Sequence, residues 1–329
     1  MKKLLTISVA AYNLETMIEQ NLKSFAACKN KDRLEVIVTN DGSKDNTASI
    51  VEKYVDEYPD VFRLINQENS GAGSTVNSGI RNATGKYFKM IDGDDWVISE
   101  NLDLLLDELE KTDSDMILTN MQVYNESLKK ITKYEKVGIT PCRRKDFSEV
   151  CSDLLINMHF VMYKTSILKE NNILLDNGFY TDVEYLLLPI PFVNTVDVYD
   201  LDIYVYRIAR AGQSVSISSM QKHIDMHDLV LKRLINFYNN IDKNEKININ
   251  IKKYIKNRIS YMADVQLGTI LSFNNKNTQE EVKKFNEFIK GANSEIYELY
   301  SNKIKCKILI RSNYKLTKLL SYIYIKKNS

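Results

Sequence analysis

The 329-residue chain has little cysteine, and the few cysteines that it has are scattered. None of them belongs to a Cys-x-x-Cys pair, and they lie far apart at Cys28, Cys142, Cys151 and Cys306. A structural zinc site needs such pairs, and a disulfide framework needs many cysteines in a small secreted domain. The sequence therefore predicts neither of these, and it fits a protein of the reducing cytosol.

Glycine and proline are also scarce, with 11 and 4 residues, and long apolar runs are missing. With 44% hydrophobic and 27% charged residues, this composition excludes fibrous and disordered chains and predicts a globular fold. The longest uncharged apolar stretch, Tyr185 to Val196, is well short of the ~20 residues that a membrane-spanning helix needs. Met1-Lys2-Lys3 leads directly into an expected strand, so we predict no signal peptide.

Positive charge is concentrated at the C-terminal end, although the net charge of the whole chain is only +2. No acidic residue follows Glu298, and the eight basic residues beyond it leave a net charge of −6 for the rest of the chain. The eight are Lys303, Lys305, Lys307, Arg311, Lys315, Lys318, Lys326 and Lys327. This tail is a distinct electrostatic feature of the molecule.

Strand-like and helix-like segments alternate over the first hundred residues. Strands are expected at residues 4–11, 34–39, 62–67 and 87–91, and apolar residues at helical spacing predict helices between them. This alternation predicts an α/β domain with a doubly wound, mostly parallel sheet. The pattern then becomes less regular, with a polar loop expected at residues 129–145. From about Ser218 the pattern is helical, so we divide the chain into a domain at 1–217 and a helical region at 218–329.

The most informative segment runs from Gly85 to Trp96, where an expected strand ends in Asp92, Gly93, Asp94 and Asp95. Three carboxylates in four residues repel one another, so a hard divalent cation among them would offset the cost of placing them at the end of a buried strand. A glycine, which has no Cβ, also lets a ligand approach the backbone closely. An acidic surface turn that caps the following helix would explain the same residues, and the local sequence leaves both interpretations open.

Four motifs in order resemble the signatures of family-2 glycosyltransferases with the GT-A fold, a Rossmann-like architecture. They are Leu5 to Asn13, Val36 to Thr47, Asn69 to Gly79 and Gly85 to Trp96, and the resemblance covers roughly residues 1–215. Four motifs with the right order and spacing are far more specific than any one of them. The resemblance implies a metal-dependent, inverting transfer of a hexose or N-acetylhexosamine from a UDP-sugar to a hydroxyl of a glycan acceptor.

The resemblance assigns the nucleotide to polar residues that follow the expected strands. Asp41 would accept the imide proton of a uracil ring, and Tyr12, with Asn13 beside it, would stack on that base. A structural role for Asp41, in closing the Asn-Asp-Gly-Ser turn, explains its local sequence about equally well.

In the acidic stretch, the resemblance places Asp92 and Gly93 at the ribose side of the nucleotide. Asp94 would bind Mn²⁺ or Mg²⁺ between the two phosphates, with Asp92 as a further metal ligand, and Asp95 would support the site. This division of roles is implied by the family and not by the local sequence.

The motif from Asn69 to Asn77 resembles the family's loop into a helix. Backbone amides and a helix N-terminus suit an anionic ligand, and Asn77 is a predicted nucleotide-binding residue. Many relatives have Ala-Arg-Asn where this chain has Thr75, Val76 and Asn77. The helix therefore lacks a cation that could contact the diphosphate.

The resemblance places the catalytic base about 90 residues after the acidic stretch, within Gly178 to Tyr185. Asp182 aligns with the base of the family's Glu-Asp pair and would take the proton of the acceptor hydroxyl. Thr181 replaces the usual Glu, so Glu184 is kept as the alternative base. A solvated acidic pair at a helix start is the interpretation without catalysis.

Residues after the last expected strand resemble the family's closing segment. Arg207 or Arg210 would supply the positive charge that is missing at Val76, although most arginines are surface residues. Gln213 and Ser214 would donate hydrogen bonds to the diphosphate.

His223 and His227 lie four residues apart on an expected helix, and therefore on one face of it. A histidine in this region completes the metal site in some relatives, so His227 is the predicted third metal ligand. An exposed helix surface is the alternative.

The basic tail has apolar residues at helical spacing among its lysines: Leu309, Leu316, Leu320 and Ile323. Such a helix, at about residues 303–327, can lie in an anionic membrane interface. This would suit a lipid-linked acceptor in bacterial capsule or cell-wall polysaccharide assembly. The protein would then be cytoplasmic and bound peripherally to the inner face of the plasma membrane. Packing of the tail on the acidic remainder is the alternative, and a nucleic-acid patch ranks lowest because no aromatic platform accompanies it.

Two other functions compete with sugar transfer. A sugar-nucleotide nucleotidyltransferase would need a glycine-rich, basic phosphate loop directly after the first strand, and Ala10 to Asn13 does not supply one. An inactive glycan-binding protein on the same fold would have no need to keep Asp94 together with Asp182.

Overall fold

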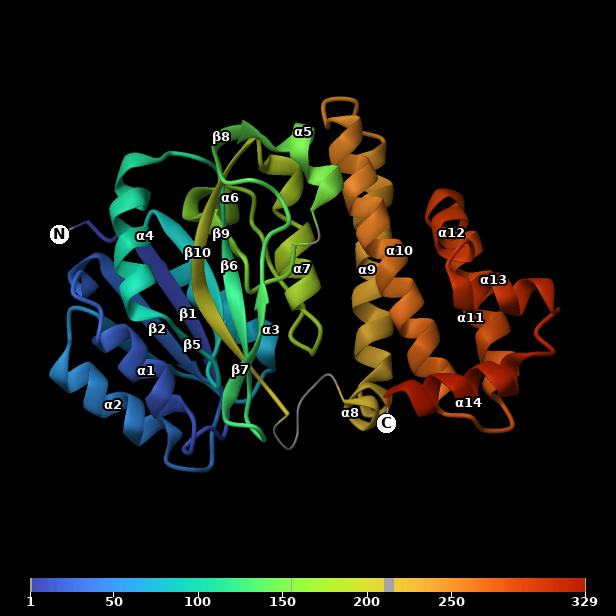
Figure 1. The fold of residues 1–329 in the computed structure, drawn as a ribbon, viewed down its shortest axis with the longest axis horizontal. Coiled ribbons are helices and arrows are strands. Elements are labelled where there is room, and N and C mark those ends of the chain that lie inside the picture. The colour runs from blue at the N-terminus through green and yellow to red at the C-terminus, as the bar shows by residue number, and fades with distance from the viewer. Residues whose placement is uncertain (1, 155, 210–215, 329) are drawn as a thin grey trace. The chain divides into compact units, whose positions relative to one another are not determined.

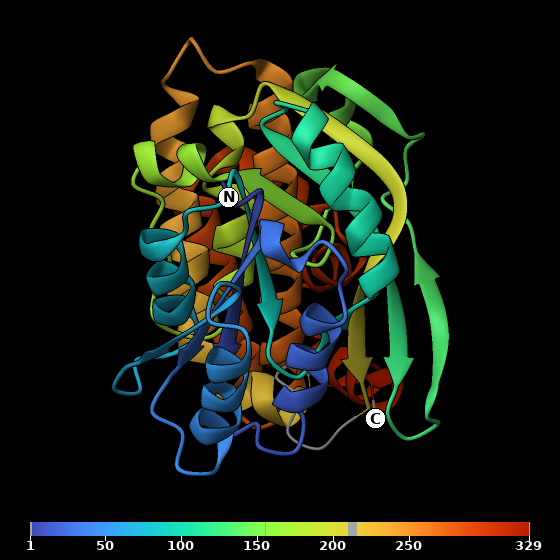
Figure 2. The same ribbon diagram turned by 90° about the vertical axis from the view of Figure 1, so that its left-hand side faces the viewer.

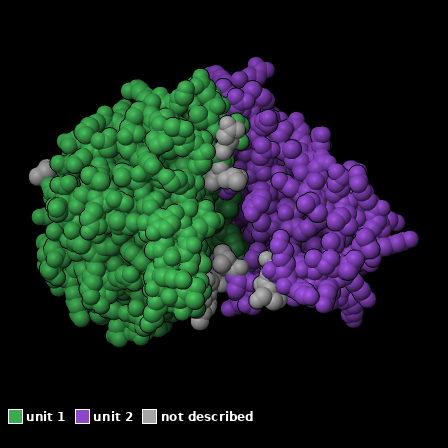
Figure 3. Space-filling view, viewed as in Figure 1, with its two compact units in different colours: residues 1–210 green, residues 211–329 purple. Residues whose placement is uncertain are grey.

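The computed structural model describes residues 2–154, 156–209 and 216–328. The chain forms two compact units, Met1–Arg210 and Ala211–Ser329, which Figure 3 draws in different colours. This division falls a few residues before the boundary that the sequence predicts.

The first unit is built around one mixed sheet. Its spatial order is β3-β2-β1-β4-β9-β6-β10-β5, with β7 paired to β6 and β8 paired to β10. The strands are β1 (Leu5–Ala11), β2 (Leu34–Asn40), β3 (Phe62–Asn66), β4 (Tyr87–Asp92), β5 (Trp96–Val97), β6 (Met116–Asn125), β7 (Lys130–Glu135), β8 (Cys142–Asp146), β9 (Val161–Lys164) and β10 (Thr195–Ile208). Strands β1, β2, β3, β4, β6 and β10 run in one direction, and strands β5, β7, β8 and β9 run against them.

Helices cover both faces of this sheet. In Figure 1, α1, α2 and α4 lie on one side and α3, α6 and α7 on the other, and Figure 2 looks onto the first of these faces. The crossover through α3 passes from the edge strand β3 back to β4, so a right-handed connection places α3 on the face opposite α1 and α2. The helices are α1 (Ile18–Ala26), α2 (Thr47–Glu57), α3 (Ala72–Asn82), α4 (Ser99–Lys111), α5 (Phe147–Val150), α6 (Thr165–Glu170) and α7 (Asp182–Leu187).

Strand β1 explains why this architecture forms. All its residues except Ala10 are buried, because helices cover both faces of the sheet and the strand pairs in parallel with β2 and β4. A parallel strand in this position is mostly apolar, and the polar side chains of β1, Thr6 and Ser8, are small. Its parallel partners also end at the same edge, where Ala10 is paired with Asp92 and Ala11 with Asn40. The polar residues that follow these strands are thereby brought together.

The structure corrects one detail of the sequence-based expectation. Residues 129–145 are not a loop, since most of them form the exposed strands β7 and β8. The predicted fold class, an α/β domain with a mostly parallel sheet followed by a helical region, is confirmed.

The second unit is helical in the part that the structure describes. Its long helices α9 and α10 pack against each other, and α10 also contacts α11, α12, α13 and α14. The bounds are α8 (Ile217–Lys222), α9 (Ile224–Asp242), α10 (Ile249–Ser272), α11 (Thr278–Ala292), α12 (Ser294–Ser301), α13 (Ile304–Arg311) and α14 (Thr317–Asn328). Among the described residues of the whole chain, no helix combines the length and the apolar character that crossing a membrane requires.

Candidate active site

The acidic turn, by which we mean Asp92 to Asp95, begins where β4 ends, at the centre of the sheet. The Gly93 amide donates a hydrogen bond to the Ala10 carbonyl oxygen (3.1 Å), which holds the turn against the end of β1. A Cβ at position 93 would lie 2.7 Å from that oxygen and 2.7 Å from Cδ1 of Leu14. The glycine is therefore required by packing against β1, which is a different reason from ligand access.

Asp95 is the buried member of the turn, with 1% of its surface exposed. Its carboxylate accepts hydrogen bonds from the Tyr204 hydroxyl (2.6 Å) and from the Arg207 backbone amide (2.7 Å). The same tyrosine hydroxyl accepts a hydrogen bond from the Asp92 amide at 3.2 Å. Burial, followed by the charges of Asp94 and Asp92, raises the pKa of Asp95 well above its usual value. Strand β10 thus supplies the donors that fix the turn.

Arg207 lies behind the turn and is itself buried. Its Nε donates to the Asp94 carbonyl oxygen (2.8 Å), and its terminal nitrogens bond Gln20 (2.5 Å) and Glu126. The guanidinium also lies over the Trp96 ring, 4.8 Å from the ring centre. Arg207 therefore positions the backbone of the acidic turn, and its contact with a diphosphate stays a prediction. Arg210, Gln213 and Ser214, the other predicted residues of this segment, lie outside the described residues.

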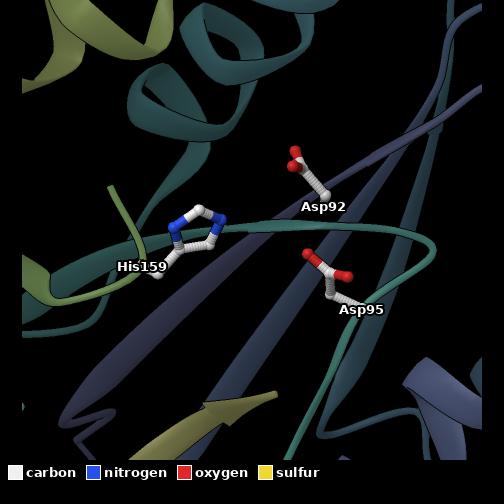
Figure 4. A group of neighbouring side chains, drawn as sticks. All are labelled: Asp92, Asp95 and His159. Carbon is white, nitrogen blue, oxygen red and sulfur yellow. The ribbon is translucent and has the colours of Figure 1, made fainter. Parts of the chain in front are cut away.

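A histidine that the sequence analysis missed completes the cluster. Potential ligand atoms of Asp92, Asp95 and His159 all lie within 4.8 Å of one another, and Figure 4 shows the two carboxylates and the imidazole facing the same space. His159 precedes β9 and packs between Tyr204 and Tyr206, with ring centres 4.6 and 4.5 Å away. Asp94 is described by the structure but is not part of this group.

The backbone of His159 is held by Lys89, a fully buried residue of β4. Its ammonium donates to the carbonyl oxygens of His159 (2.7 Å) and Val161 (3.4 Å). Burial lowers the pKa of Lys89 to about 7. Burial and the charge of Lys89 together lower the pKa of His159 to about 3, so its imidazole is neutral and able to bind a metal ion.

The donor set suits a hard or borderline divalent cation. Carboxylate oxygens bind both Mg²⁺ and Mn²⁺, and an imidazole nitrogen favours Mn²⁺ over Mg²⁺. Each oxygen of the Asp95 carboxylate accepts one hydrogen bond and keeps a lone pair for an ion. The residues present therefore fit a Mn²⁺ site at the carboxyl edge of the sheet.

A polar groove adjoins this edge, beside the ends of β1, β2 and β3. Its volume is ≈ 560 Å³, and Tyr12 is the one aromatic residue of its lining, with 49% of its surface exposed. Asn13 closes the neighbouring turn, since its amide donates to Ser43 Oγ (3.0 Å) and its side chain accepts from the Lys44 amide (2.8 Å). An exposed ring over a polar groove is the arrangement that base stacking needs.

Asp41 follows β2 and is 3% exposed. Its Oδ1 accepts hydrogen bonds from Gln67 Nε2 (2.7 Å) and the Ser70 amide (2.9 Å), and its Oδ2 accepts one from the Gly71 amide (2.9 Å). The sequence predicts that amides of this loop bind an anionic ligand, and for these two amides the anion is the Asp41 carboxylate. One lone pair of Oδ2 remains for a uracil imide, so that contact stays a prediction.

The helix that follows this loop, α3, packs against the segment that leads to the predicted base and is hydrogen-bonded to it. The Asn77 side chain donates to the Leu175 carbonyl oxygen and accepts from the Leu175 amide, both at 2.8 Å. A Cβ at Gly71 or Gly73 would lie 1.6 Å from the carbonyl oxygen of Asn177 or Asp176. Asn77 thus positions backbone, and nucleotide contact by Asn77 stays a prediction.

Asp182 is the first residue of α7 and is partly exposed. Two residues earlier Tyr180 has a φ of +68°, a strained conformation for a tyrosine that orients the entry into the helix. Glu184, the alternative base, is fully buried and accepts a hydrogen bond from the Asp176 amide (2.7 Å). The structure therefore gives Glu184 a structural role and leaves Asp182 as the accessible carboxylate of the pair.

His227 lies in α9, within the second unit, and is buried. Burial lowers its pKa to about 4, against a smaller effect of its hydrogen bond with Gln266. Its role as the third metal ligand stays a prediction. His223 lies between α8 and α9, so the expectation that both histidines share one helix face is wrong, and His223 is more exposed than His227.

Comparison with known proteins assigns the fold and the family. The family model for glycosyl transferase family 2 matches residues 6–171, just over half of the chain. The chain belongs to glycosyl transferase family 2. Membership of this family favours sugar transfer over the nucleotidyltransferase alternative.

Relatives in sequence are glycosyltransferases of bacteria and of a protist. A segment of 115 residues, 35% of this chain and 33% of the relative, is 35% identical to the putative glycosyltransferase EpsH of Bacillus subtilis. An alignment of 182 positions with the dolichyl-phosphate beta-glucosyltransferase ALG5A of Trichomonas vaginalis covers 47% of this chain and 56% of the relative, at 28% identity. The matches thus span about a third to a half of these relatives.

Solved structures share the fold over nearly the whole chain. TarS residues 1–349 of S. aureus superpose with a TM-score of 0.70 at 19% identity, covering 98% of this chain and 91% of that one. The mannosyltransferase PcManGT of Pyrobaculum calidifontis, in complex with GDP-Man and Mn²⁺, gives a TM-score of 0.54 at 15% identity, covering 99% and 86%. At these identities the likeness shows the GT-A-like fold alone.

The Tyr204 hydroxyl provides a test of how the acidic turn is fixed. Tyr204→Phe removes one of two donors to a buried carboxylate, so we expect a loss of about 1–3 kcal/mol in the free energy of unfolding, measured with urea. Mn²⁺ affinity should fall as well, because the carboxylate loses the bond that orients it.

Tyr199→Phe is the matched control, since Tyr199 also lies on β10 and donates to a buried aspartate, Asp197 (3.1 Å). It should lower stability to a similar degree and leave Mn²⁺ binding unchanged. Equal Mn²⁺ affinity in both variants would contradict the assigned role of Tyr204.

Proposed function

We propose that this family-2 glycosyltransferase transfers a sugar from a UDP-sugar to a hydroxyl of a glycan acceptor, with inversion at the anomeric carbon and dependence on a divalent metal ion. The observation that carries the proposal is the convergence of Asp92, Asp95 and His159 at the end of β4. In open α/β sheets this edge is where ligands bind, and the groove beside Tyr12 adjoins it.

In this proposal Asp92 and His159 hold Mn²⁺ or Mg²⁺, with Asp95 beside them. The neutral imidazole of His159 and the carboxylate oxygens of Asp92 are ligands of the kind that such an ion takes. The ion would neutralise charge that develops on the departing diphosphate. Asp94 and His227 remain predicted ligands of the same ion.

UDP is the proposed nucleotide. Asp41 keeps one lone pair that can accept the imide proton of uracil, and Tyr12 offers an exposed ring for stacking. Structures of TarS, which shares the fold, are complexes with UDP-GlcNAc and with UDP. They support a UDP-hexose or UDP-N-acetylhexosamine as the donor.

Asp182 is the proposed base. Its carboxylate takes the proton of the acceptor hydroxyl, and the freed oxygen attacks the anomeric carbon while the bond from that carbon to the diphosphate oxygen breaks. The electron pair of that bond leaves with UDP. Attack from the side opposite the leaving group inverts the anomeric configuration.

The proposed acceptor is a lipid-linked oligosaccharide or a growing cell-surface polysaccharide, such as those of the bacterial capsule or cell wall. The name of the relative ALG5A refers to dolichyl phosphate, a lipid phosphate. The basic C-terminal region supports the same choice, since it suits an anionic surface such as the inner face of the plasma membrane.

Substitution of the proposed base tests the mechanism. Asp182→Asn should lower the rate of UDP release from the UDP-sugar that wild-type protein uses, with Mn²⁺ and acceptor present, by about 10²–10⁴-fold. UDP affinity, measured by calorimetry, should stay within about twofold, because Asp182 takes no part in nucleotide binding in this proposal.

Glu184→Gln is the matched control. A glutamine oxygen can still accept the hydrogen bond of the Asp176 amide, so the variant should fold and keep most of its activity. Loss of activity in this variant, with an active Asp182→Asn protein, would assign the base to Glu184 instead.

Two histidine variants test the metal site. His159→Gln should weaken Mn²⁺ binding about tenfold or more, measured by electron paramagnetic resonance of the free ion, because a ligand is lost. His227→Gln should have the same effect only if His227 also binds the ion. Unchanged Mn²⁺ affinity of a folded His159→Gln protein would remove His159 from the site.

A further inference from the structure

The last helix of the chain, α14, is attached to α10 by one of its faces. Thr317 and Ser321 on this face are buried. The side chain of Tyr324 lies so close to Gly268 of α10 that a Cβ there would be 2.7 Å from two ring carbons and from the hydroxyl oxygen. The ammonium of Lys305 lies 5.4 Å from the centre of the same ring and bonds Asp264 of α10 at 3.0 Å. These contacts fix the rotation of α14 about its own axis.

The opposite face of α14 carries large apolar side chains that are exposed. Leu319, Tyr322 and Ile323 follow the i, i+3, i+4 spacing of one helix face, and Leu316 precedes them in the adjoining turn. Their exposed fractions are 39% for Leu316, 52% for Leu319, 60% for Tyr322 and 49% for Ile323. We call these four residues the α14 face. Exposed apolar side chains gathered in this way mark an interaction surface.

The charges around the α14 face have one sign. Lys315, Lys318, Lys326 and Lys327 are all exposed, and no acidic residue occurs after Glu298. Within the part of the chain that the structure describes, none of these four lysines forms an ion pair. Lys305, by contrast, is neutralised by Asp264. The four lysines are therefore available to an external anion.

We propose that the α14 face docks on a bilayer that contains anionic phospholipids. Leucine, isoleucine and tyrosine side chains insert at the boundary of headgroups and acyl chains, while lysines around them contact lipid phosphates. A second copy of this chain fits poorly, because docking face to face would bring lysines against lysines. A nucleic acid offers no apolar partner for leucine and isoleucine.

This inference deepens the proposed lipid-linked acceptor and rests on it for its biological meaning. Docking itself requires no sugar transfer, so it can be measured separately. If vesicles are bound and UDP is not, the proposed function fails and the docking surface stands; the reverse result would reject the docking surface alone.

The test is flotation of the full chain with vesicles of phosphatidylcholine alone or with 30% phosphatidylglycerol, an amount of about the order found in anionic membranes. The wild-type protein should float with the anionic vesicles and remain behind with the neutral ones. Leu319→Ser/Ile323→Ser should lower the partition coefficient about tenfold or more, since two apolar side chains no longer insert. Equal flotation of this variant would overturn the proposal.

The second unit offers a matched control for the apolar residues. Leu229 and Ile249 are 57% and 73% exposed, at least as much as Leu319 and Ile323. Leu229→Ser/Ile249→Ser should float like the wild type, and an equal loss in this control would show that the α14 face is not the docking surface. Circular dichroism and UDP calorimetry confirm that each variant is folded.

The lysines are tested in the same way. Lys318→Gln/Lys326→Gln should weaken binding to anionic vesicles about tenfold, and 0.5 M salt, on the order of three times physiological strength, should do the same to the wild type. The control Lys243→Gln/Lys246→Gln removes two exposed lysines from the second unit and should bind normally. Sedimentation that shows a dimer, disrupted by Leu319→Ser/Ile323→Ser, would assign the face to a second copy and overturn the lipid proposal.

Discussion

The burial of Asp95 at the end of β4 constrains the whole of the first unit. A buried carboxylate must be satisfied by donors, and those that reach it come from Tyr204 and Arg207, more than 100 residues away in sequence. The Asp95 carbonyl oxygen is also held by Asn21 of α1 (2.8 Å). The acidic turn is therefore ordered only when β10 and α1 are in place. The position in which Asp92 would meet a ligand therefore depends on the complete sheet.

A second constraint joins the nucleotide side of the site to the acceptor side. The Asp41 carboxylate holds the loop that opens α3, and α3 holds Leu175 through Asn77. Leu175 leads into the segment that ends at Asp182, the proposed base. Both the residue proposed to bind the nucleotide and the segment that carries the proposed base are therefore hydrogen-bonded to α3 or to the loop before it. The motif from Asn69 to Asn77 thus links the donor side of the site to the acceptor side.

The fold and part of the site could be predicted because buried parallel strands read as apolar runs that end in polar residues. Asp41 and the acidic turn follow such strands, while the resemblance supplied their predicted roles. His159 could not be predicted, since no motif surrounds it and only the pairing of β9 between β4 and β6 brings it to Asp92. The sequence also does not reveal the partners of Arg207 within the protein, and its contact with the ligand stays a prediction. Strands β7 and β8 were missed because exposed strands at the rim carry no apolar alternation.

The central claim is that Asp92 and its neighbours hold a metal ion that the nucleotide needs. Calorimetry of UDP binding to the full chain, with Mn²⁺ and with excess chelator, tests it most directly. The account predicts that the chelator weakens binding at least about tenfold and that Asp92→Asn protein binds UDP weakly under both conditions. The exposed control Asp200→Asn should behave like the wild type. Equal UDP affinity with and without Mn²⁺ in the wild type would contradict the account.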